Sequence, residues 1–331
     1  MTAARSTGHR VVVYGVTGQL GRELVERLEA SDWPIDELVG VASAASLGRE
    51  FEFRGEEQDV LPEAPPLTGR DLVFICTPRA AALEIVRDAL RAEVACVDCS
   101  GALATQPAVP LLRGSATPQD ADEVLAKAPV VAIASSTTLA WLPVLEALDA
   151  AGGLARLAAT VLTSAGSWGR GGVAALSEES IALFNQSAPP PLGPAGRPIA
   201  FDVVPGGAVE AGRVRAELER LFGKALPLAL SAVQVPTFVG EGALLSIELA
   251  RPLAGDAIER ALEARPELLV GEGASLRDAL GEARVRVGAI EPDASGEAGR
   301  AWRLWLASDP LRLVADAAMR AAEARLGLGP A

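Results

Sequence analysis

A glycine-rich turn near the N-terminus constrains the fold of this chain more than any other feature. The apolar run Val11–Tyr14 leads into Gly15–Gly21 (GVTGQLG), and a helical pattern continues over Arg22–Ala30. Glycines in such a turn permit a positive φ, close approach of the backbone to a pyrophosphate, and close packing of the helix on the sheet. The helix N-terminus also offers free N–H groups to an anion. This order of elements predicts a dinucleotide-binding turn; the alternative is a tight turn without a ligand. The predicted cofactor-binding residues are Gly15, Thr17, Gly18, Gln19, Leu20 and Gly21.

Length and charge limit the kinds of partner. The chain has 331 residues, enough for two domains, and 50% of them are hydrophobic, as in a folded globular protein. Its net charge of −13 argues against a nucleic-acid partner, which requires basic residues to replace counterions on phosphate. No apolar run reaches the roughly 18–20 residues of a membrane-spanning helix, and no signal peptide is readable. We therefore expect a small-molecule ligand, no membrane association and a cytoplasmic location.

The three cysteines do not indicate a disulfide framework or a metal site. Cys96 and Cys99 form a C-x-x-C pattern inside an apolar run, and Cys76 ends another such run. Residues three apart on a strand point to opposite faces. We therefore expect Cys96 and Cys99 to be two core thiols, and we predict no metal site.

Strand-like and helical segments alternate through the first third of the chain. The predicted strands are Arg10–Tyr14, Glu37–Val41, Asp71–Cys76, Val94–Asp98 and Val130–Ala134. The predicted helices are Gly21–Ala30, Ala80–Ala92 and Pro118–Lys127. This alternation predicts a Rossmann-like, doubly wound parallel sheet with helices on both faces.

The pattern changes after a predicted helix at Leu139–Ala150. A glycine-rich stretch (166–172), a helix (178–186) and a proline-rich surface loop (188–194) come next. Strand-like runs follow at Val233–Val239, Leu244–Leu249 and Trp302–Ala307, which predicts an α+β domain with a mostly antiparallel sheet.

The chain ends in a predicted helix, Pro310–Leu326, with Asp309 as its cap and Gly327 as its stop. One face of this helix is apolar, and we expect it to pack on the first domain. The predicted domains are therefore residues 1–133 with 309–331, and residues 134–308.

Short segments spread over the whole chain share their order and spacing with one enzyme family. They are Asp32–Leu38, Ala42–Gly48, Phe53–Gly55, Val97–Ser100, Val109–Leu111, Phe201–Pro205, Val235–Gly240 and Leu304–Asp309. These segments, with the glycine turn, resemble the aspartate-semialdehyde dehydrogenases of amino-acid biosynthesis. The resemblance implies a homodimer built on the second domain's sheet. It also implies reduction of an acyl phosphate to a semialdehyde by NADPH, through a thioester on a cysteine.

The family's catalytic residues are replaced at the matching positions. Ser136 stands in place of the nucleophilic cysteine, Thr163 in place of a glutamine, Gln234 in place of the substrate-binding arginine, and Glu241 in place of the histidine base. A serine nucleophile needs a base beside it. The single histidine, His9, lies in what we interpret as a solvated leader, whereas Glu241 is a candidate base if burial raises its pKa. Cys99, at the end of a parallel strand, is an alternative nucleophile.

The cofactor site is altered less than the catalytic site. Ser43 and Ser46 stand where the family contacts the 2′-phosphate of NADP, but Ala45 replaces the arginine between them. Losing one charge-assisted contact costs about 1.5–3 kcal/mol. Arg49 is near enough in sequence to substitute, and Ala104 replaces a second anion-binding arginine. No acidic residue follows the second strand, which disfavours a plain NAD site.

The sequence therefore predicts a pseudoenzyme that keeps an NAD(P)-binding fold, with NADP modestly preferred over NAD. The joint loss of the cysteine, histidine and arginine favours this hypothesis. The alternative is an active NADP-dependent semialdehyde dehydrogenase with altered chemistry.

Overall fold

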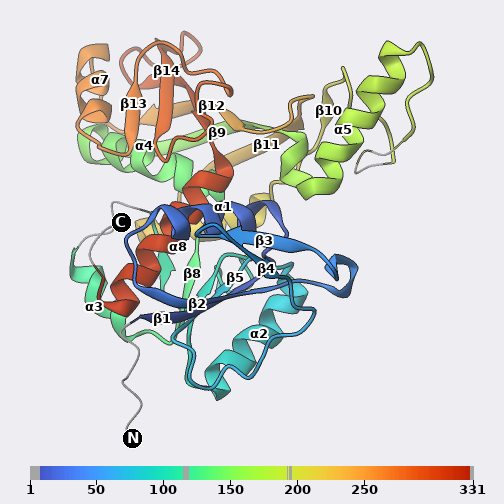
Figure 1. The fold of residues 1–331 in the computed structure, drawn as a ribbon. Helices are drawn as coiled ribbons and strands as arrows, with labels where there is room; N and C mark the ends of the chain where they lie inside the picture. Colours follow the sequence, from blue (N-terminus) through green and yellow to red (C-terminus); the bar gives the residue numbers. More distant parts are fainter. Residues whose placement is uncertain (1–7, 115–118, 192, 194–195, 329–331) are drawn as a thin grey trace, which may run out of the picture. The chain divides into compact units, whose positions relative to one another are not determined.

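The computed structural model describes residues 8–114, 119–191, 193 and 196–328. Pro118, Leu192 and Pro194, which belong to the predicted helix and loop above, lie outside these ranges. The chain forms two compact units, residues 1–135 with 314–331 and residues 136–313 (Figure 1). The boundaries expected from the sequence lie a few residues from these divisions.

The first unit contains a six-stranded sheet in the order β2-β1-β5-β6-β8-β7, and every strand pair in it is parallel. Its strands are β1 (His9–Tyr14), β2 (Ile35–Val41), β5 (Leu72–Ile75), β6 (Ala95–Asp98), β7 (Leu111–Leu112) and β8 (Val130–Ile133). Its helices are α1 (Gln19–Ala30), α2 (Arg79–Arg91), α3 (Gln119–Lys127) and the greater part of α8 (Pro310–Leu326). Helices α1 and α8 cover one face and α2 covers the other (Figure 1), which confirms the predicted doubly wound sheet.

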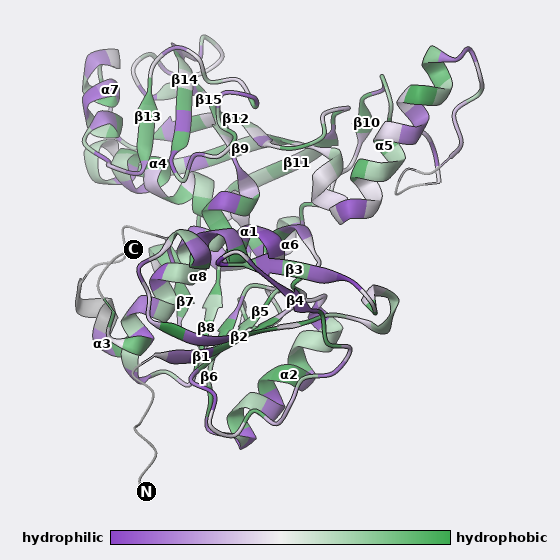
Figure 2. Ribbon diagram, in the orientation of Figure 1, coloured by the Kyte–Doolittle hydropathy of each residue, from purple (hydrophilic) through white to green (hydrophobic). Residues whose placement is uncertain are grey.

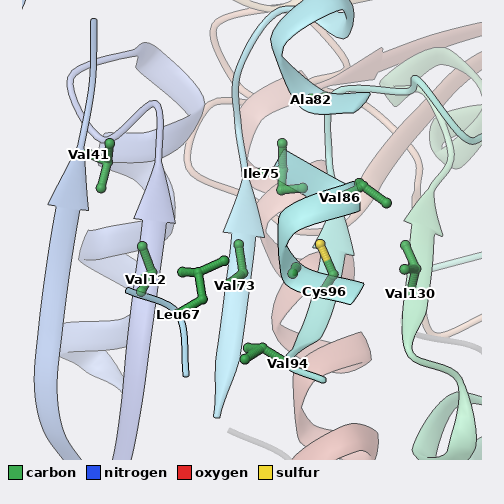
Figure 3. Packing of buried hydrophobic residues seen from close by; sticks show 11 residues of the cluster. Val12, Val41, Leu67, Val73, Ile75, Ala82, Val86, Val94, Cys96 and Val130 are labelled. Carbon is green, nitrogen blue, oxygen red and sulfur yellow. The ribbon is translucent and has the colours of Figure 1, made fainter. Parts of the chain in front are cut away.

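Helix α2 and the strands beneath it share one apolar core. Val12, Val73, Cys96 and Val130 project from successive strands toward Val86 of α2 (Figure 3). Each fully buried side chain of this size contributes roughly 1.5–3 kcal/mol. Because helices cover both faces, strands such as β5 and β8 are buried at every residue. This explains why they read as continuous apolar runs in the sequence.

The glycine turn joins β1 to α1 in a conformation that two of its glycines require. Gly15 has φ +83°, and a Cβ there would collide with the backbone carbonyl of Cys76. A Cβ on Gly21 would meet the Gly15 carbonyl oxygen and lie 2.8 Å from Val16 Cα. Glycine at position 21 therefore lets the first turn of α1 pack against the end of β1, and glycine at position 15 lets the turn lie against the residue that follows β5.

A hairpin of β3 (Glu50–Phe53) and β4 (Glu56–Asp59) follows β2 and was not expected from the sequence. Its residues are largely acidic, and Figure 2 shows hydrophilic β3 in contrast to apolar β5 and β8. Arg54 and Gly55 connect the strands with φ values of 54° and 77°, the two consecutive positive values that a tight hairpin turn favours.

The second unit contains a seven-stranded mixed sheet in the order β10-β11-β9-β12-β15-β14-β13. Its strands are β9 (Leu154–Thr163), β10 (Val204–Pro205), β11 (Leu228–Gln234), β12 (Glu241–Leu249), β13 (Leu268–Val270), β14 (Val285–Pro292) and β15 (Ala301–Ser308). Its helices are α4 (Ser136–Gly152), α5 (Gly169–Phe184), α6 (Ala211–Phe222) and α7 (Gly255–Glu263), in addition to the first residues of α8. The pairs β9–β11 and β13–β14 are parallel and the other four are antiparallel, as a mostly antiparallel sheet requires.

Three local expectations for this unit were wrong. Strand β11 ends at Gln234, so residues 235–239 are a loop containing Pro236 rather than the end of a strand. Helix α5 begins at Gly169, earlier than expected, and its Gly172 lies so close to the Ala165 carbonyl that only glycine fits there. Helix α4 likewise begins at Ser136 instead of Leu139.

The terminal helix α8 has the predicted bounds and ends. Asp309 Oδ1 accepts hydrogen bonds from the N–H groups of Leu311 (3.0 Å) and Arg312 (3.1 Å), and Gly327 follows with φ +68°. Asp316 of α8 forms an ion pair of 2.7 Å with Arg27 of α1. Across the parts of the chain that the structure describes, no helix combines the length and apolar character needed to cross a bilayer.

The glycine turn yields a prediction about stability. Replacing Gly21 by Ala places a methyl group against the Gly15 carbonyl, so we expect the free energy of unfolding to fall by about 1–3 kcal/mol. A Cβ added at Gly212 of α6 would have nothing within 4 Å, so Gly212→Ala is the matched control and is expected to raise stability by at most about 1 kcal/mol. Urea unfolding of both variants measures the difference. Equal stability for the two variants contradicts the packing described here.

Candidate functional site

Three of the four predicted catalytic positions lie in one row across the sheet of the second unit. Thr163 ends β9 and pairs with Gln234 of β11 on one side and with Glu241 of β12 on the other. The parallel register with β11 and the antiparallel register with β12 thus bring these side chains together from distant parts of the sequence.

Ser136 joins this row from the first position of α4. Its hydroxyl donates a hydrogen bond of 3.3 Å to Glu241 Oε2, and the next residue, Thr137, also hydrogen-bonds to the Glu241 carboxyl. The structure therefore brings together all four predicted catalytic positions. It adds Thr137, which the sequence reasoning missed although it directly follows Ser136.

The Glu241 carboxyl is buried, with 7% of the residue exposed. Burial raises its pKa to about 7, against the opposing effect of the hydrogen bonds from Thr137 and Ser136. Among the described residues, no basic side chain forms an ion pair with it. Near neutral pH this side chain therefore exists both as an acid and as a carboxylate.

Gln234 is held by a second set of hydrogen bonds. Its Oε1 accepts from the Trp168 indole Nε1 (2.8 Å) and from Thr163 Oγ1 (3.2 Å), and its Nε2 donates to the Val235 carbonyl (3.0 Å). Both acceptor positions of the amide oxygen are thereby used. Trp168 was not predicted; the only signal was a single large aromatic residue inside a glycine-rich segment.

The predicted cofactor-binding residues lie in the first unit. Gly15, Gly18 and Gly21 form the turn, and Gly18 caps α1, whose first N–H groups have no acceptor within the helix. The Thr17 and Ser46 hydroxyls are 3.1 Å apart and buried. A glycine at the cap of a helix whose first N–H groups have no side-chain acceptor at the cap is an arrangement suited to an anion such as a pyrophosphate.

Residues 43–49 carry the remaining cofactor candidates, and only some of them reach solvent. Ser43, Ala45 and Arg49 are exposed, whereas Ser46 is buried against Thr17. Ser43 is therefore available to a phosphate, while the Ser46 hydroxyl already has a partner. Ala104, where a second arginine was expected, is fully buried.

His9 and Cys99, the remaining candidates, lie in the first unit. His9 is the first residue of β1, with its backbone N–H bound to the Pro34 carbonyl at 2.6 Å, so it does not precede the first strand as expected, although the residue is partly exposed. Cys96 is a core thiol as expected, but Cys99 is half-buried, because β6 ends one residue before it. Within the described ranges there is no cluster of three potential metal ligands.

Comparison with known proteins gives a consistent result. The semialdehyde dehydrogenase NAD-binding domain matches residues 10–124. A USG-1 protein homologue from Pseudomonas aeruginosa is 31% identical over 326 residues, covering 91% of this chain and 93% of that protein. Aspartate-semialdehyde dehydrogenase from Corynebacterium glutamicum is 27% identical over 327 residues, covering 91% and 94%.

A solved structure extends the likeness to the fold. The crystal structure of aspartate-semialdehyde dehydrogenase II from Vibrio cholerae superimposes with a TM-score of 0.85 at 22% identity, covering 97% of this chain and 99% of that one. Sequence similarity along nearly the whole chain, the matching NAD-binding domain and the shared fold lead to one conclusion: this chain belongs to the aspartate-semialdehyde dehydrogenase family.

Proposed function

We propose that this chain is a non-catalytic member of its family, which keeps the dinucleotide-binding fold and does not carry out the dehydrogenase reaction. The observation that supports this most is the serine at the nucleophile position, with its hydroxyl bonded to the buried Glu241. The protein then acts as a binding, scaffold or regulatory partner.

The chemistry of the reaction explains why the serine matters. Hydride transfer in this family passes through an acyl group on sulfur, and a cysteine thiol with a pKa near 8.5 is both a nucleophile and a good leaving group. A serine hydroxyl is a weak nucleophile without a strong base. The ester that it forms is also a poorer hydride acceptor than a thioester.

The substrate-binding group is also replaced. An arginine at the position of Gln234 binds a substrate carboxylate through two charge-assisted hydrogen bonds. Gln234 is neutral, and its amide oxygen is engaged by Trp168 and Thr163. A carboxylate arriving here finds no positive charge in the row formed by Thr163, Gln234 and Glu241, so selective binding of an aspartate-like substrate is not expected.

A second candidate function rests on the pair formed by Ser136 and Glu241. A carboxyl with a pKa of about 7 titrates in the range in which histidine ordinarily acts as a general base, and it lies 3.3 Å from the serine hydroxyl. This favours, as the alternative, an enzyme with serine-based acyl chemistry. The two hypotheses differ in whether any turnover depends on Ser136.

The cofactor is proposed to be NADP, with NAD as a close competitor. The glycine turn and the N-terminus of α1 suit the pyrophosphate of both. Exposed Ser43 and Arg49 are the groups available to a 2′-phosphate, while Ala45 contributes no charge. When bound, the nicotinamide ring would supply the hydride chemistry; this chain's own part is to hold the phosphates.

We also propose that the protein is a homodimer built on the sheet of the second unit. Leu244 of β12 is 43% exposed in the single chain, an unusual position for a large apolar residue in the middle of a sheet. A second copy packed against this part of the sheet would bury it.

The activity prediction separates the two candidate functions. We expect no phosphate-dependent oxidation of aspartate semialdehyde by the wild type or by Ser136→Cys, since each missing group supplies about 10²–10⁴-fold in rate. NADPH formation is measured for these two proteins and for the triple variant Ser136→Cys, Gln234→Arg, Glu241→His. Any recovered turnover is expected in the triple variant alone. Turnover by the wild type that is lost in Ser136→Ala supports the serine-based enzyme instead.

Cofactor binding provides a separate prediction. Calorimetric titration is expected to give binding of both NADP and NAD, with NADP only modestly tighter because one phosphate contact is missing. Removing the remaining charge with Arg49→Ala is expected to reduce NADP affinity toward that of NAD and to leave NAD binding unchanged. No heat with either cofactor at millimolar concentration contradicts the proposal.

Glu241 makes stability depend on pH. Its pKa is about 7 in the folded protein, above the ordinary value of 4.5 expected when unfolded. The folded state therefore binds the Glu241 proton more tightly than the unfolded state does. The resulting stabilisation of the folded state is fully present below about pH 4.5 and is lost as pH rises through 7. The total loss is about 3 kcal/mol. Urea unfolding from pH 5 to pH 8 is expected to show this loss in wild type and not in Glu241→Gln. Glu248→Gln, on the exposed side of β12, is the control and should behave like wild type; identical pH profiles for all three contradict the assignment.

A further inference from the structure

Two cysteines outside the candidate site lie side by side in the first unit. Cys76 directly follows β5 and Cys99 directly follows β6. These strands are parallel neighbours in which Ile75 pairs with Asp98, and the Cys99 N–H donates a 3.0 Å hydrogen bond to the Ile75 carbonyl. The next pair in this register is therefore Cys76 with Cys99.

The register gives the two thiols a common direction. Paired residues on neighbouring parallel strands project to the same face, and each step along the strand alternates the face. Cys96 projects into the core beneath α2 (Figure 3). Cys76 and Cys99 therefore belong to the opposite face. Neighbouring strands are about 4.7–4.9 Å apart, which lies within the Cα separation of roughly 4.4–6.8 Å that a disulfide spans.

Access to solvent distinguishes this pair from the third cysteine. Cys76 and Cys99 are both half-buried, whereas Cys96 is 2% exposed. A side-chain hydrogen bond with Cys76, together with burial, raises the pKa of the Cys99 thiol. The Cys99 thiol therefore favours its protonated form, and we assign the first attack on an oxidant to the Cys76 sulfur.

We propose that Cys76 and Cys99 form a vicinal dithiol that is oxidised to a disulfide by peroxides. The Cys76 sulfur attacks one oxygen of the peroxide and the O–O bond breaks; the released hydroxide takes up the Cys76 thiol proton as the first water, and Cys76 becomes a sulfenic acid. The Cys99 sulfur then displaces the sulfenic hydroxyl, which leaves with the Cys99 proton as water. In total, two thiols and one hydrogen peroxide give one disulfide and two waters.

The site borders the glycine turn. Gly15 packs so closely on the backbone carbonyl of Cys76 that a side chain at Gly15 cannot fit. The dithiol therefore lies at the same end of the parallel sheet as the turn. Its chemistry depends only on the two sulfurs, so it stands or falls independently of the proposed function.

The experiment oxidises the full-length protein under native conditions. The reduced protein is treated with hydrogen peroxide, alkylated and analysed by intact mass and peptide mapping. We expect the loss of two thiols and two hydrogen atoms, with Cys76 linked to Cys99. Because Cys96 and Cys99 lie close in sequence, Cys96→Ala is the matched control and should give the same disulfide. In Cys99→Ser, a sulfenic acid on Cys76 is expected to react with dimedone.

Phenylarsine oxide, which binds paired thiols without oxidation, provides the second measurement. We expect one equivalent to bind to the wild type and to Cys96→Ala, and none to bind to Cys76→Ser or Cys99→Ser. Three free thiols after peroxide treatment, a disulfide through Cys96, or arsenical binding that persists in Cys76→Ser would each overturn the proposal.

Discussion

The burial of the Glu241 carboxyl at the start of β12 is the constraint around which the candidate site is organised. A buried carboxyl is costly unless hydrogen bonds satisfy it. Here Ser136 and Thr137 provide those bonds from the first turn of α4, while burial still holds the pKa near 7. These hydrogen bonds link the start of α4 to the start of β12, and Ser136 and Glu241 are 105 positions apart in the sequence.

A second contact set completes the row and explains its chemical character. The Gln234 amide oxygen accepts hydrogen bonds from Trp168 and Thr163. These polar groups therefore bind one another and are not available to a charged ligand. The fold of a semialdehyde dehydrogenase is kept, while the groups at its reactive position are neutral or weakly acidic. Function resides in such groups and not in the fold, which is why family membership and the proposed loss of catalysis are compatible.

The sequence was most informative where one local rule dominated. Strands β5 (LVFI) and β8 (VVAI), which are buried at every residue, are apolar at every position, and the Asp309 cap with the Gly327 stop defined α8. By contrast, β9 (LARLAATVLT) has an alanine- and leucine-rich composition that favours a helix, and only its neighbours make it the centre of a sheet. Likewise, no local pattern reveals that Glu241 is buried or that Trp168 reaches Gln234, because both depend on strand register and on packing between distant segments.

Ser136, which is hydrogen-bonded to Glu241, is expected not to form an acyl intermediate. The most direct measurement is the intact mass of the protein after incubation with aspartate semialdehyde and NADP in the absence of phosphate, since an acyl group then has no phosphate to leave with. Acid quenching and peptide mapping locate any adduct. The account predicts an unmodified peptide containing Ser136. An acyl group on Ser136 that is absent from Ser136→Ala would contradict it.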